Sequence, residues 1–282
     1  MDTTEVDPRA AAVVALKPSE YAKSRLDLPT PLRQRLAWTM ALDTLRALAP
    51  ALSRVVVVSG QPALASRLAR AGVSAEVVSE PAQPGINAAL NHGADRLRAD
   101  GAATVLACVG DLPALRAASV ARVLQVSRAF PRAFLADASG VGTTMLVAHD
   151  AKLAPDFSGR SAARHRAGGA VPLTEEVLGS PLADARCDVD TEIDLATAIG
   201  LGVGIDTAAL VDPAEGRLGR YQVVTTTGWT DDHGQPLAVT AAGRRVVLPD
   251  GAVANSSTSR PVRPGQRLHA VTAAGRVLSA WW

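Results

Sequence analysis

The 282-residue sequence contains few aromatic side chains and only two cysteines. Phenylalanine, tyrosine and tryptophan together make up 3% of it, so we expect a core built from alanine, valine and leucine. Cys108 and Cys187 lie far apart and form no CxxC pair, which argues against a zinc site and against a fold that depends on disulfides. We expect both cysteines to be small buried residues.

Long apolar runs and an excess of one charge are also missing. No run approaches the roughly 18 apolar residues of a membrane span. The segment from Met1 to Arg9 is polar and acidic, whereas a signal peptide would be basic and then apolar. We therefore expect a cytoplasmic protein without membrane contact. The net charge of +2 gives no case for a nucleic-acid partner, although local basic clusters can still bind an anionic substrate.

What the sequence does contain is an alternation of short apolar runs and helical patterns, from Ala10 to about Gly204. This order predicts an α/β fold with a mostly parallel sheet and helices on both faces. In such sheets, ligands bind at the carboxyl ends of the strands. The predicted strands are 10–16, 55–59, 75–79, 104–109, 133–136 and 144–148, and the predicted helices are 32–49, 62–71, 86–98, 117–129 and 192–200.

The pattern changes after Gly204, and from Arg220 onward the chain has no helical period. The sequence AVTAAGR occurs at 238–244 and again at 270–276, which suggests paired hairpins or is a chance repeat in an alanine-rich chain. We predict a domain at 1–204, a linker at 205–219 and a small β-barrel or sandwich-like unit at 220–282. The strands predicted in this unit are 223–227, 237–240, 245–248, 268–272 and 276–281.

The loop after the first predicted strand lacks the GxGxxG pattern of a dinucleotide-binding fold, which argues against a nicotinamide or flavin enzyme. It contains Lys17, Lys23 and Arg25 instead. Three cations at the carboxyl end of a buried strand suit a polyphosphate, whose charge must be matched there. The alternative interpretation is a solvated surface loop.

Three aspartates are candidates for a metal site. Asp111 directly follows the fourth predicted strand, where it either meets a ligand or serves as a turn or helix cap. In an extended segment, Asp188 and Asp190 point to the same face. Such a pair ahead of a helix suits Mg²⁺, which takes carboxylate and phosphate oxygens. The alternative for Asp190 is a cap of the helix that follows.

Two loops are rich in hydrogen-bond donors. The first approaches a strand through Gly140, Gly142 and Thr143, and its alternative is an ordinary turn. The second contains Ser158 and Ser161, and Ser161 can open a helix whose N-terminus attracts phosphate. His165 lies in the same segment. Transfer from a triphosphate to an acceptor that is already anionic needs no general base, so we favour a positional role for His165. Together these features describe nucleotidyl transfer.

These residues also resemble a known family, the phosphoenolpyruvate guanylyltransferases (2-phospho-L-lactate guanylyltransferase family) of coenzyme F-420 biosynthesis. The resemblance covers about Ala10 to Gly204, and it implies a glycosyltransferase-A-like nucleotidyltransferase fold. The combination of motifs in their order is specific, while the individual pieces are not. The motifs that carry the resemblance are Lys17 with Lys23-Ser24-Arg25-Leu26, Ile86-Asn87, Gly110-Asp111-Leu112-Pro113-Ala114-Leu115, Gly142-Thr143, Ser161-Ala162-Ala163-Arg164-His165 and Arg186-Cys187-Asp188-Val189-Asp190-Thr191.

The resemblance implies that GTP and phosphoenolpyruvate react to give enolpyruvoyl-2-diphospho-5'-guanosine and pyrophosphate, with Mg²⁺ as cofactor. The family usually has glycine where this chain has Ser158, with Gly159 following. The site residues that the resemblance implies are Thr143, Ser158 and Ser161 for phosphoenolpyruvate, Asp111, Asp188 and Asp190 for catalysis and Mg²⁺, and Lys17, Lys23, Arg25 and Asn87 for the nucleotide.

Several alternatives remain open at this point. The acceptor can be 2-phospho-L-lactate, 3-phosphoglycerate or a molybdopterin-type substrate, or the chain can be a nucleotide-binding regulator without catalysis. Nothing carries over to the segment beyond Gly204, which can serve as a lid, a homodimer contact or a docking unit for the next enzyme of the pathway. Trp281 and Trp282 would form an exposed apolar surface unless they pack.

Overall fold

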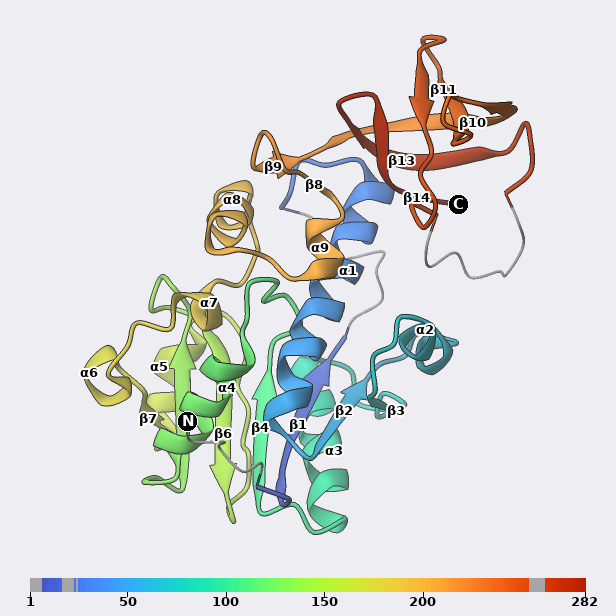
Figure 1. Ribbon diagram of the computed structural model, residues 1–282. Helices are drawn as coiled ribbons and strands as arrows, with labels where there is room; N and C mark the ends of the chain where they lie inside the picture. The colour runs from blue at the N-terminus through green and yellow to red at the C-terminus, as the bar shows by residue number, and fades with distance from the viewer. Residues whose placement is uncertain (1–6, 17–22, 24, 254–261) are drawn as a thin grey trace.

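The computed structural model describes residues 7–16, 23, 25–253 and 262–282. A seven-stranded sheet has the strand order β3-β2-β1-β4-β6-β5-β7, and a separate five-stranded barrel stands beyond one end of it (Figure 1). The sheet strands are β1 (Ala10–Ala15), β2 (Arg54–Val58), β3 (Glu76–Val78), β4 (Thr104–Cys108), β5 (Arg132–Ala136), β6 (Thr143–His149) and β7 (Val171–Pro172). The helices are α1 (Thr30–Leu48), α2 (Leu64–Arg70), α3 (Ile86–Ala99), α4 (Ala117–Ser127), α5 (Ser161–Ala167), α6 (Glu175–Leu178), α7 (Ala183–Arg186), α8 (Glu192–Leu201) and α9 (Ile205–Ala208), with a 3-10 turn η2 (Ala49–Ala51) after α1.

The sheet is mostly parallel, as predicted, with one exception. Strand β6 runs antiparallel to both β4 and β5. The short segment 137–142 joins β5 to β6, and a connection of that length makes a hairpin, since a parallel crossover needs a dozen residues or more. The carboxyl ends of β1, β4 and β5 and the amino end of β6 therefore meet at one edge of the sheet.

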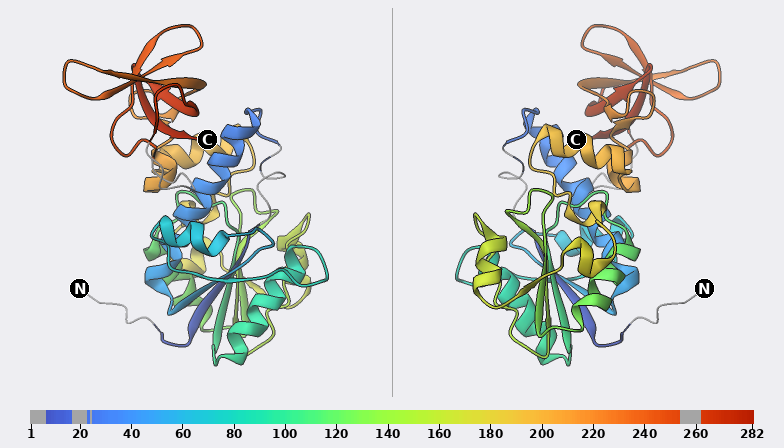
Figure 2. Two further views of the ribbon diagram at one scale, coloured as in Figure 1. Left: turned by 90° about the vertical axis from the view of Figure 1, so that its right-hand side faces the viewer. Right: turned by 90° about the vertical axis from the view of Figure 1, so that its left-hand side faces the viewer.

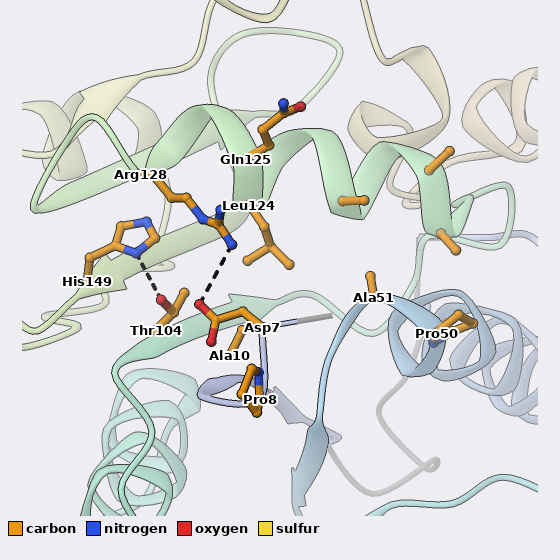
Figure 3. Close-up of a pocket in the computed structure, with 13 residues that line it drawn as sticks. Asp7, Pro8, Ala10, Pro50, Ala51, Thr104, Leu124, Gln125, Arg128 and His149 are labelled. Carbon is orange, nitrogen blue, oxygen red and sulfur yellow. Dashed lines mark hydrogen bonds and ion pairs between the residues drawn. The ribbon is translucent and has the colours of Figure 1, made fainter. Parts of the chain in front are cut away.

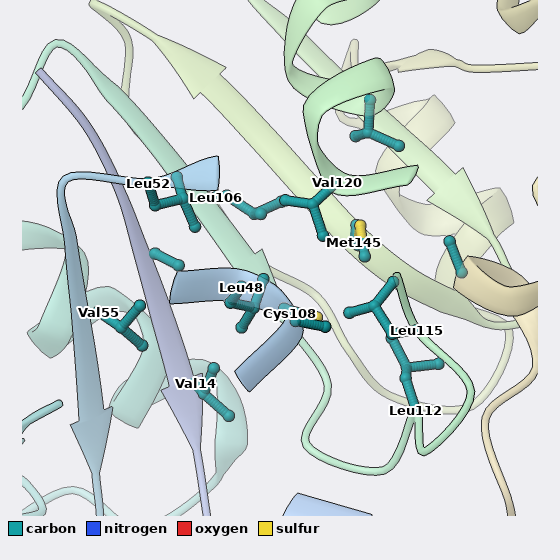
Figure 4. Packing of buried hydrophobic residues seen from close by; sticks show 14 of the residues in the cluster. Val14, Leu48, Leu52, Val55, Leu106, Cys108, Leu112, Leu115, Val120 and Met145 are labelled. Carbon is teal, nitrogen blue, oxygen red and sulfur yellow. The ribbon is translucent and has the colours of Figure 1, made fainter. Parts of the chain in front are cut away.

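Helices cover both faces of the sheet, as Figure 2 shows. Side chains alternate along β1 between two apolar layers: Val14 joins the layer beneath α1, α2 and α4, and Val13 joins the layer beneath α3 and α5. Figure 4 shows the first layer, in which Leu48 and Val120 reach the strands from α1 and α4. Gly93 lets α3 approach the sheet closely, because a side chain there would overlap Val13 and Val58.

Helix α1 belongs to two cores. Its carboxyl half packs on the sheet through Leu42, Leu45 and Leu48. Its amino half projects beyond the sheet, and Leu36 and Met40 pack there in a second core with α8 and the barrel. The helix thus links the sheet to the carboxyl-terminal part of the chain (Figure 1).

The β-rich unit predicted near the end of the chain is present as a closed barrel. Both copies of AVTAAGR end a strand and begin a tight turn, which is the paired-hairpin arrangement. Val224, Leu268 and Val277 are among the side chains that fill the interior. The barrel strands are β10 (Arg220–Thr230), β11 (Pro236–Thr240), β12 (Arg245–Val247), β13 (Arg267–Ala273) and β14 (Arg276–Trp281).

The segment expected as a linker contains α9 and a small hairpin of β8 (Val211–Asp212) and β9 (Arg217–Leu218). The buried Asp43 carboxylate of α1 accepts the N–H groups of Asp206 (3.0 Å) and Thr207 (2.8 Å), which fixes α9 to α1. Burial raises the pKa of Asp43. No helix in the described part of the chain is long and apolar enough to cross a membrane.

Candidate active site

A cavity of about 310 Å³ opens at the carboxyl ends of β1 and β4, against α1 and α2. Its walls include Trp38, Gln61 and Arg67, which were not among the predicted site residues. The Arg67 guanidinium lies 4.1 Å from the centre of the Trp38 ring and donates to Gln61 Oε1 at 3.1 Å. An aromatic ring, an amide and a cation side by side suit a planar polar base. Trp38 lies within the helix predicted at 32–49, where the apolar pattern gives it no role at a site.

Lys23 and two of the predicted aspartates meet at the edge of this cavity. The Lys23 ammonium forms a short ion pair with Asp111 Oδ2 and lies 3.3 Å from Asp190 Oδ1. Burial alone lowers the pKa of Lys23, but the Asp111 and Asp190 carboxylates outweigh that effect, so the pKa lies above its usual value. Arg25 is more exposed and reaches Asp190 Oδ2 at 3.3 Å. Lys17 lies outside the described residues.

Asp188 is the third carboxylate of the group. The Val189 N–H donates to the Asp111 carbonyl oxygen (3.1 Å), which ties the segment of Asp188 and Asp190 to the loop after β4. Burial, reinforced by the nearby charges of Asp111, Asp137 and Asp190, raises the pKa of Asp188 to about 7. A half-buried carboxylate among like charges is stabilised by a cation nearby.

The chemistry of these groups fits a divalent cation. The buried Asp111 Oδ1 has no hydrogen-bond partner. The Lys23 ammonium bridges the carboxylates of Asp111 and Asp190. Among the described residues, no group of three or more His, Cys, Asp or Glu side chains stands ready to hold a metal ion as arranged. A cation at Asp111 and Asp190 would therefore replace the Lys23 ammonium between them.

Thr143 and His165 form a buried pair beside the start of β6. The His165 ring accepts the Asp156 N–H at Nε2 (2.9 Å), so its proton lies on Nδ1, 2.9 Å from Thr143 Oγ1. Burial lowers the pKa of His165 to about 4, and the ring is therefore neutral near pH 7. Because Thr143 accepts that bond, its own hydroxyl hydrogen is left to donate. The positional role of His165 stays a prediction, and the two hydrogen bonds of its neutral ring are compatible with it.

Ser158 and Ser161 lie in the segment that follows Asp156. Ser161 is the first residue of α5, as predicted, and its side chain is buried. The Ser158 hydroxyl donates to Asp156 Oδ1 (2.8 Å) and accepts from Arg164 (3.1 Å). The left-handed backbone conformation falls on Gly159 (φ +54°), and Ser158 does not adopt it. The loop therefore accommodates serine where the family usually has glycine.

Asp137, at the end of β5, is a residue that the sequence did not reveal. Its carboxylate accepts the N–H groups of Val141 (3.0 Å) and Gly142 (2.8 Å) and the Ser139 hydroxyl (2.8 Å). The turn that leads into Thr143 is built around this carboxylate, and a side chain at Gly142 would overlap it. No short motif marks such a residue, because its partners are mainly backbone groups.

Two further predicted features have structural partners. The Asn87 side-chain oxygen accepts the Phe157 N–H (2.7 Å), so Asn87 joins α3 to the loop of Ser158. Gly110 lines the cavity, and a side chain there would overlap Leu16.

A larger cavity of about 720 Å³ lies at the opposite edge of the sheet (Figure 3). It opens beside Ala10 and Thr104, the first residues of β1 and β4, whereas ligands of such sheets bind at the carboxyl ends. Its polar groups are already paired: Thr104 with His149 at 2.9 Å, and Arg128 with Asp7 at 3.7 Å. We therefore place the active site at the aspartate edge.

The chain is similar to known nucleotidyltransferases. The family described as MobA-like NTP transferase domain matches residues 30–180. The phosphoenolpyruvate guanylyltransferase of Streptomyces coelicolor is 46% identical over 204 residues, which cover 70% of this chain and 93% of the relative. The enzyme of the same name from Geodermatophilus obscurus is 42% identical over 213 residues, covering 72% and 94%.

A solved structure shares the fold. It is a putative nucleotide-diphospho-sugar transferase from Desulfovibrio desulfuricans, with a TM-score of 0.52 and 17% sequence identity, covering 67% of this chain and 85% of that one. At that identity the likeness shows the arrangement of the sheet and helices and nothing about substrates.

Proposed function

The chain belongs to the phosphoenolpyruvate guanylyltransferase family, and from this premise we propose that it transfers the guanylyl group of GTP to phosphoenolpyruvate. The products are enolpyruvoyl-2-diphospho-5'-guanosine and pyrophosphate, and the pathway is coenzyme F-420 biosynthesis. The observation that carries the proposal is the meeting of Asp111, Asp188 and Asp190 with Lys23 and Arg25 at the carboxyl edge of the sheet, beside a cavity with room for a base.

The chemical problem at this site is the charge of two anions. A phosphate oxygen of the acceptor attacks the α-phosphorus of GTP, a new P–O bond forms, and the bond to the pyrophosphate oxygen breaks in line with it. No proton needs to move, so the neutral His165 is not required as a base. Lys23 and Arg25 supply positive charge to the triphosphate, which stabilises the departing pyrophosphate.

Mg²⁺ is the cofactor that we propose, held by Asp111, Asp188 and Asp190. When bound, it would neutralise charge between the donor and acceptor phosphates. The aspartates provide the oxygen ligands that this ion prefers, and the buried Asp111 Oδ1 has no hydrogen-bond partner that an ion would have to displace. Before the metal binds, the Lys23 ammonium neutralises part of the charge of Asp111 and Asp190. We infer that it pairs with the phosphates of GTP once the metal is bound.

We assign the acceptor acid to the other half of the site. The free hydrogen of the Thr143 hydroxyl can donate to an anionic oxygen, and His165 fixes its direction. Ser161 and the backbone of Ser158 lie on the same loop and complete the donors that we propose for the acid. The Asp137 turn connects this half to the aspartates, because the Ala138 N–H donates to the Arg186 carbonyl (2.9 Å) just ahead of them.

The remaining assignments are also proposals. We keep the division into a guanylyltransferase domain at 1–204, a connecting segment at 205–219 and a barrel unit at 220–282. We place the protein in the cytoplasm, with GTP and the phosphorylated acid as its small-molecule partners and Lys17 and Asn87 near the nucleotide. A homodimer and a contact with the next pathway enzyme are both compatible with the exposed surface of the barrel.

Pyrophosphate release tests the substrate assignment. The protein is incubated with Mg²⁺, GTP or ATP, and in turn phosphoenolpyruvate, 2-phospho-L-lactate and 3-phosphoglycerate. We expect the highest kcat/KM for GTP with phosphoenolpyruvate. Faster turnover of another acid would reassign the acceptor while keeping the reaction. GTP binding without pyrophosphate release for any acid would refute catalysis and favour a regulator.

A further inference from the structure

The barrel at the end of the chain has a specific strand order. Neighbouring strands follow the order β10-β11-β12-β14-β13, and β13 closes the barrel on β10. The third and fifth strands, β12 and β14, pair in parallel, and the other pairs are antiparallel. This is the five-stranded Greek-key arrangement of the OB-fold. OB-folds bind oligonucleotides and oligosaccharides across their second and third strands and the adjoining loops.

One side of this barrel is already occupied by the catalytic part of the chain. Val271 is buried in the core that α1 shares with α8, and Trp281 packs at the edge of that core. Arg35 of α1 donates to the Ser279 hydroxyl (3.2 Å) and lies over the Trp281 ring. Of the two tryptophans at 281 and 282, Trp281 is therefore packed and Trp282 is 39% exposed. Strand β11 lies on the side turned away from the sheet (Figure 1).

The free side carries an aromatic ring beside a cation. Trp229, near the end of β10, is 60% exposed. The Arg245 guanidinium of β12 lies 5.6 Å from the centre of its ring. Arg245 belongs to the third strand, β12, and is paired with Val239 of the second, β11. The contact between Trp229 and Arg245 therefore joins the first strand to the third beside β11. A large exposed indole is costly in water, and a flat exposed ring can stack with a base.

Charge is distributed unevenly between the barrel and the rest of the chain. Residues 220–282 contain seven arginines and three aspartates, with no lysine or glutamate, a net charge of +4. Residues 1–219 contain 22 basic and 24 acidic residues, a net charge of −2. The whole-chain value of +2, from which we expected no nucleic-acid partner, averages over this difference. A basic module on an acidic enzyme indicates an anionic partner for the module itself.

The basic residues also gather at one place. A cavity of about 280 Å³ beside the turns β11–β12 and β13–β14 is lined by Arg217, Arg220, Arg244 and Arg245. Among the described residues, the one ion pair that these four make is that of Arg217 with Glu215, at 3.6 Å. Asp212 also lines this cavity, but among the described residues no ion pair joins a carboxylate to the other three arginines. Guanidinium groups suit phosphate oxygens. The cavity adjoins the Trp229 surface through Arg245.

We propose that the barrel binds single-stranded nucleic acid across β11 and β12, with a base stacked on Trp229 and the phosphates held by Arg244, Arg245 and the neighbouring arginines. Stacking on an aromatic ring tolerates any base, so the binding is expected to depend little on sequence. The surface is separate from the aspartate site, and the proposal does not rest on guanylyl transfer.

Fluorescence anisotropy of the full chain with a labelled oligonucleotide of about 12 nucleotides, dT or rU, tests this proposal. We expect binding that weakens as salt rises and that exceeds binding to a duplex of equal length. Trp229→Leu and Arg245→Gln should each weaken it about fivefold or more, and Trp229→Tyr should retain it. Arg245→Gln should also reduce the salt slope by about 0.7.

Arg9→Ala serves as the matched control, because it removes one positive charge at the amino end of β1, at the sheet edge opposite the aspartates. It should bind the oligonucleotide as the unmodified protein does, and Trp229→Leu should release pyrophosphate at the unmodified rate. Three results would overturn the proposal: no binding at low salt, unchanged binding by Trp229→Leu, or displacement by polyglutamate as effective as by unlabelled oligonucleotide. The last would indicate docking of an acidic protein.

Discussion

The Lys23 ammonium lies between Asp111 and Asp190, where we propose that the metal ion binds. Removing its charge should therefore strengthen metal binding while weakening catalysis. Lys23→Met keeps the length of the side chain and removes its charge. We expect it to tighten Mn²⁺ binding in the absence of nucleotide, because the ion no longer competes with an ammonium. The same change should lower turnover, because the triphosphate loses a positive partner.

The size of the effect follows from the contacts. The Lys23 side chain is 8% exposed and that of Asp111 25%, so solvent screens this contact weakly. The Asp190 side chain is 49% exposed, so its contact with Lys23 is screened more and is left out of the estimate. A hydrogen bond to a charged group contributes about 1.5–3 kcal/mol, and about 1.4 kcal/mol corresponds to a factor of ten in affinity. Loss of this competitor should therefore raise Mn²⁺ affinity about tenfold to a hundredfold.

The assay is a titration of the protein with Mn²⁺, followed by the electron paramagnetic resonance signal of the free ion. Lys152→Met is the matched control, because Lys152 is exposed and follows β6 at the far edge of the sheet. It should leave both Mn²⁺ affinity and turnover unchanged. Equal or weaker Mn²⁺ binding by Lys23→Met would show that the ammonium does not hold the ion's place.

Three further predictions concern the acceptor pocket and the core. The pKa of His165 is about 4 in the folded chain and about 6.5 unfolded, so the unfolded state binds an extra proton between those values. Stability should fall as pH drops through this window, by about 3 kcal/mol in all, and urea unfolding of His165→Asn should show a flatter profile. Thr143→Val should raise KM for the acid about tenfold and leave KM for GTP unchanged, whereas Thr143→Ser should behave as the unmodified chain; equal effects on both substrates would contradict its assignment. Gly93→Ala should lower the free energy of unfolding by about 1–3 kcal/mol, measured by denaturant titration, since its methyl group would overlap Val13; an unchanged midpoint would contradict the close packing of α3.

The sequence predicted the central strands of the sheet closely, because they are buried on both faces and form apolar runs. Ala10–Ala15 is the clearest case. The prediction missed the short edge strand β7 and the short helices α6 and α7, which leave no such pattern. An apolar run does not show in which direction a strand runs. The antiparallel direction of β6 results from the short segment 137–142 that joins it to β5. The barrel strands were also found, and their closing order depends on pairings between residues far apart in sequence.

The candidate site was predictable where a side chain directly follows a strand. Asp111 is such a residue, and its place at the carboxyl edge follows from the parallel order of β1 and β4. Thr143 begins β6 and reaches the same edge because β6 runs antiparallel to its neighbours. Trp38 and Arg67 were missed because helix periodicity assigns an apolar residue to the core and a lone arginine to the surface. Their contact appears only when α1 and α2 lie side by side. Asp137 was missed because it mainly binds backbone N–H groups.

Pyrophosphate release from GTP and phosphoenolpyruvate by the unmodified chain and by Asp188→Asn tests the central claim most directly. The substitution keeps the shape of a half-buried side chain and removes the charge that would hold the metal. We predict steady release by the unmodified chain and a rate about a thousandfold lower in Asp188→Asn, corresponding to about 4 kcal/mol of barrier, with an unchanged circular dichroism spectrum. An unmodified rate in the folded Asp188→Asn variant, or no release by the unmodified chain, would contradict the account.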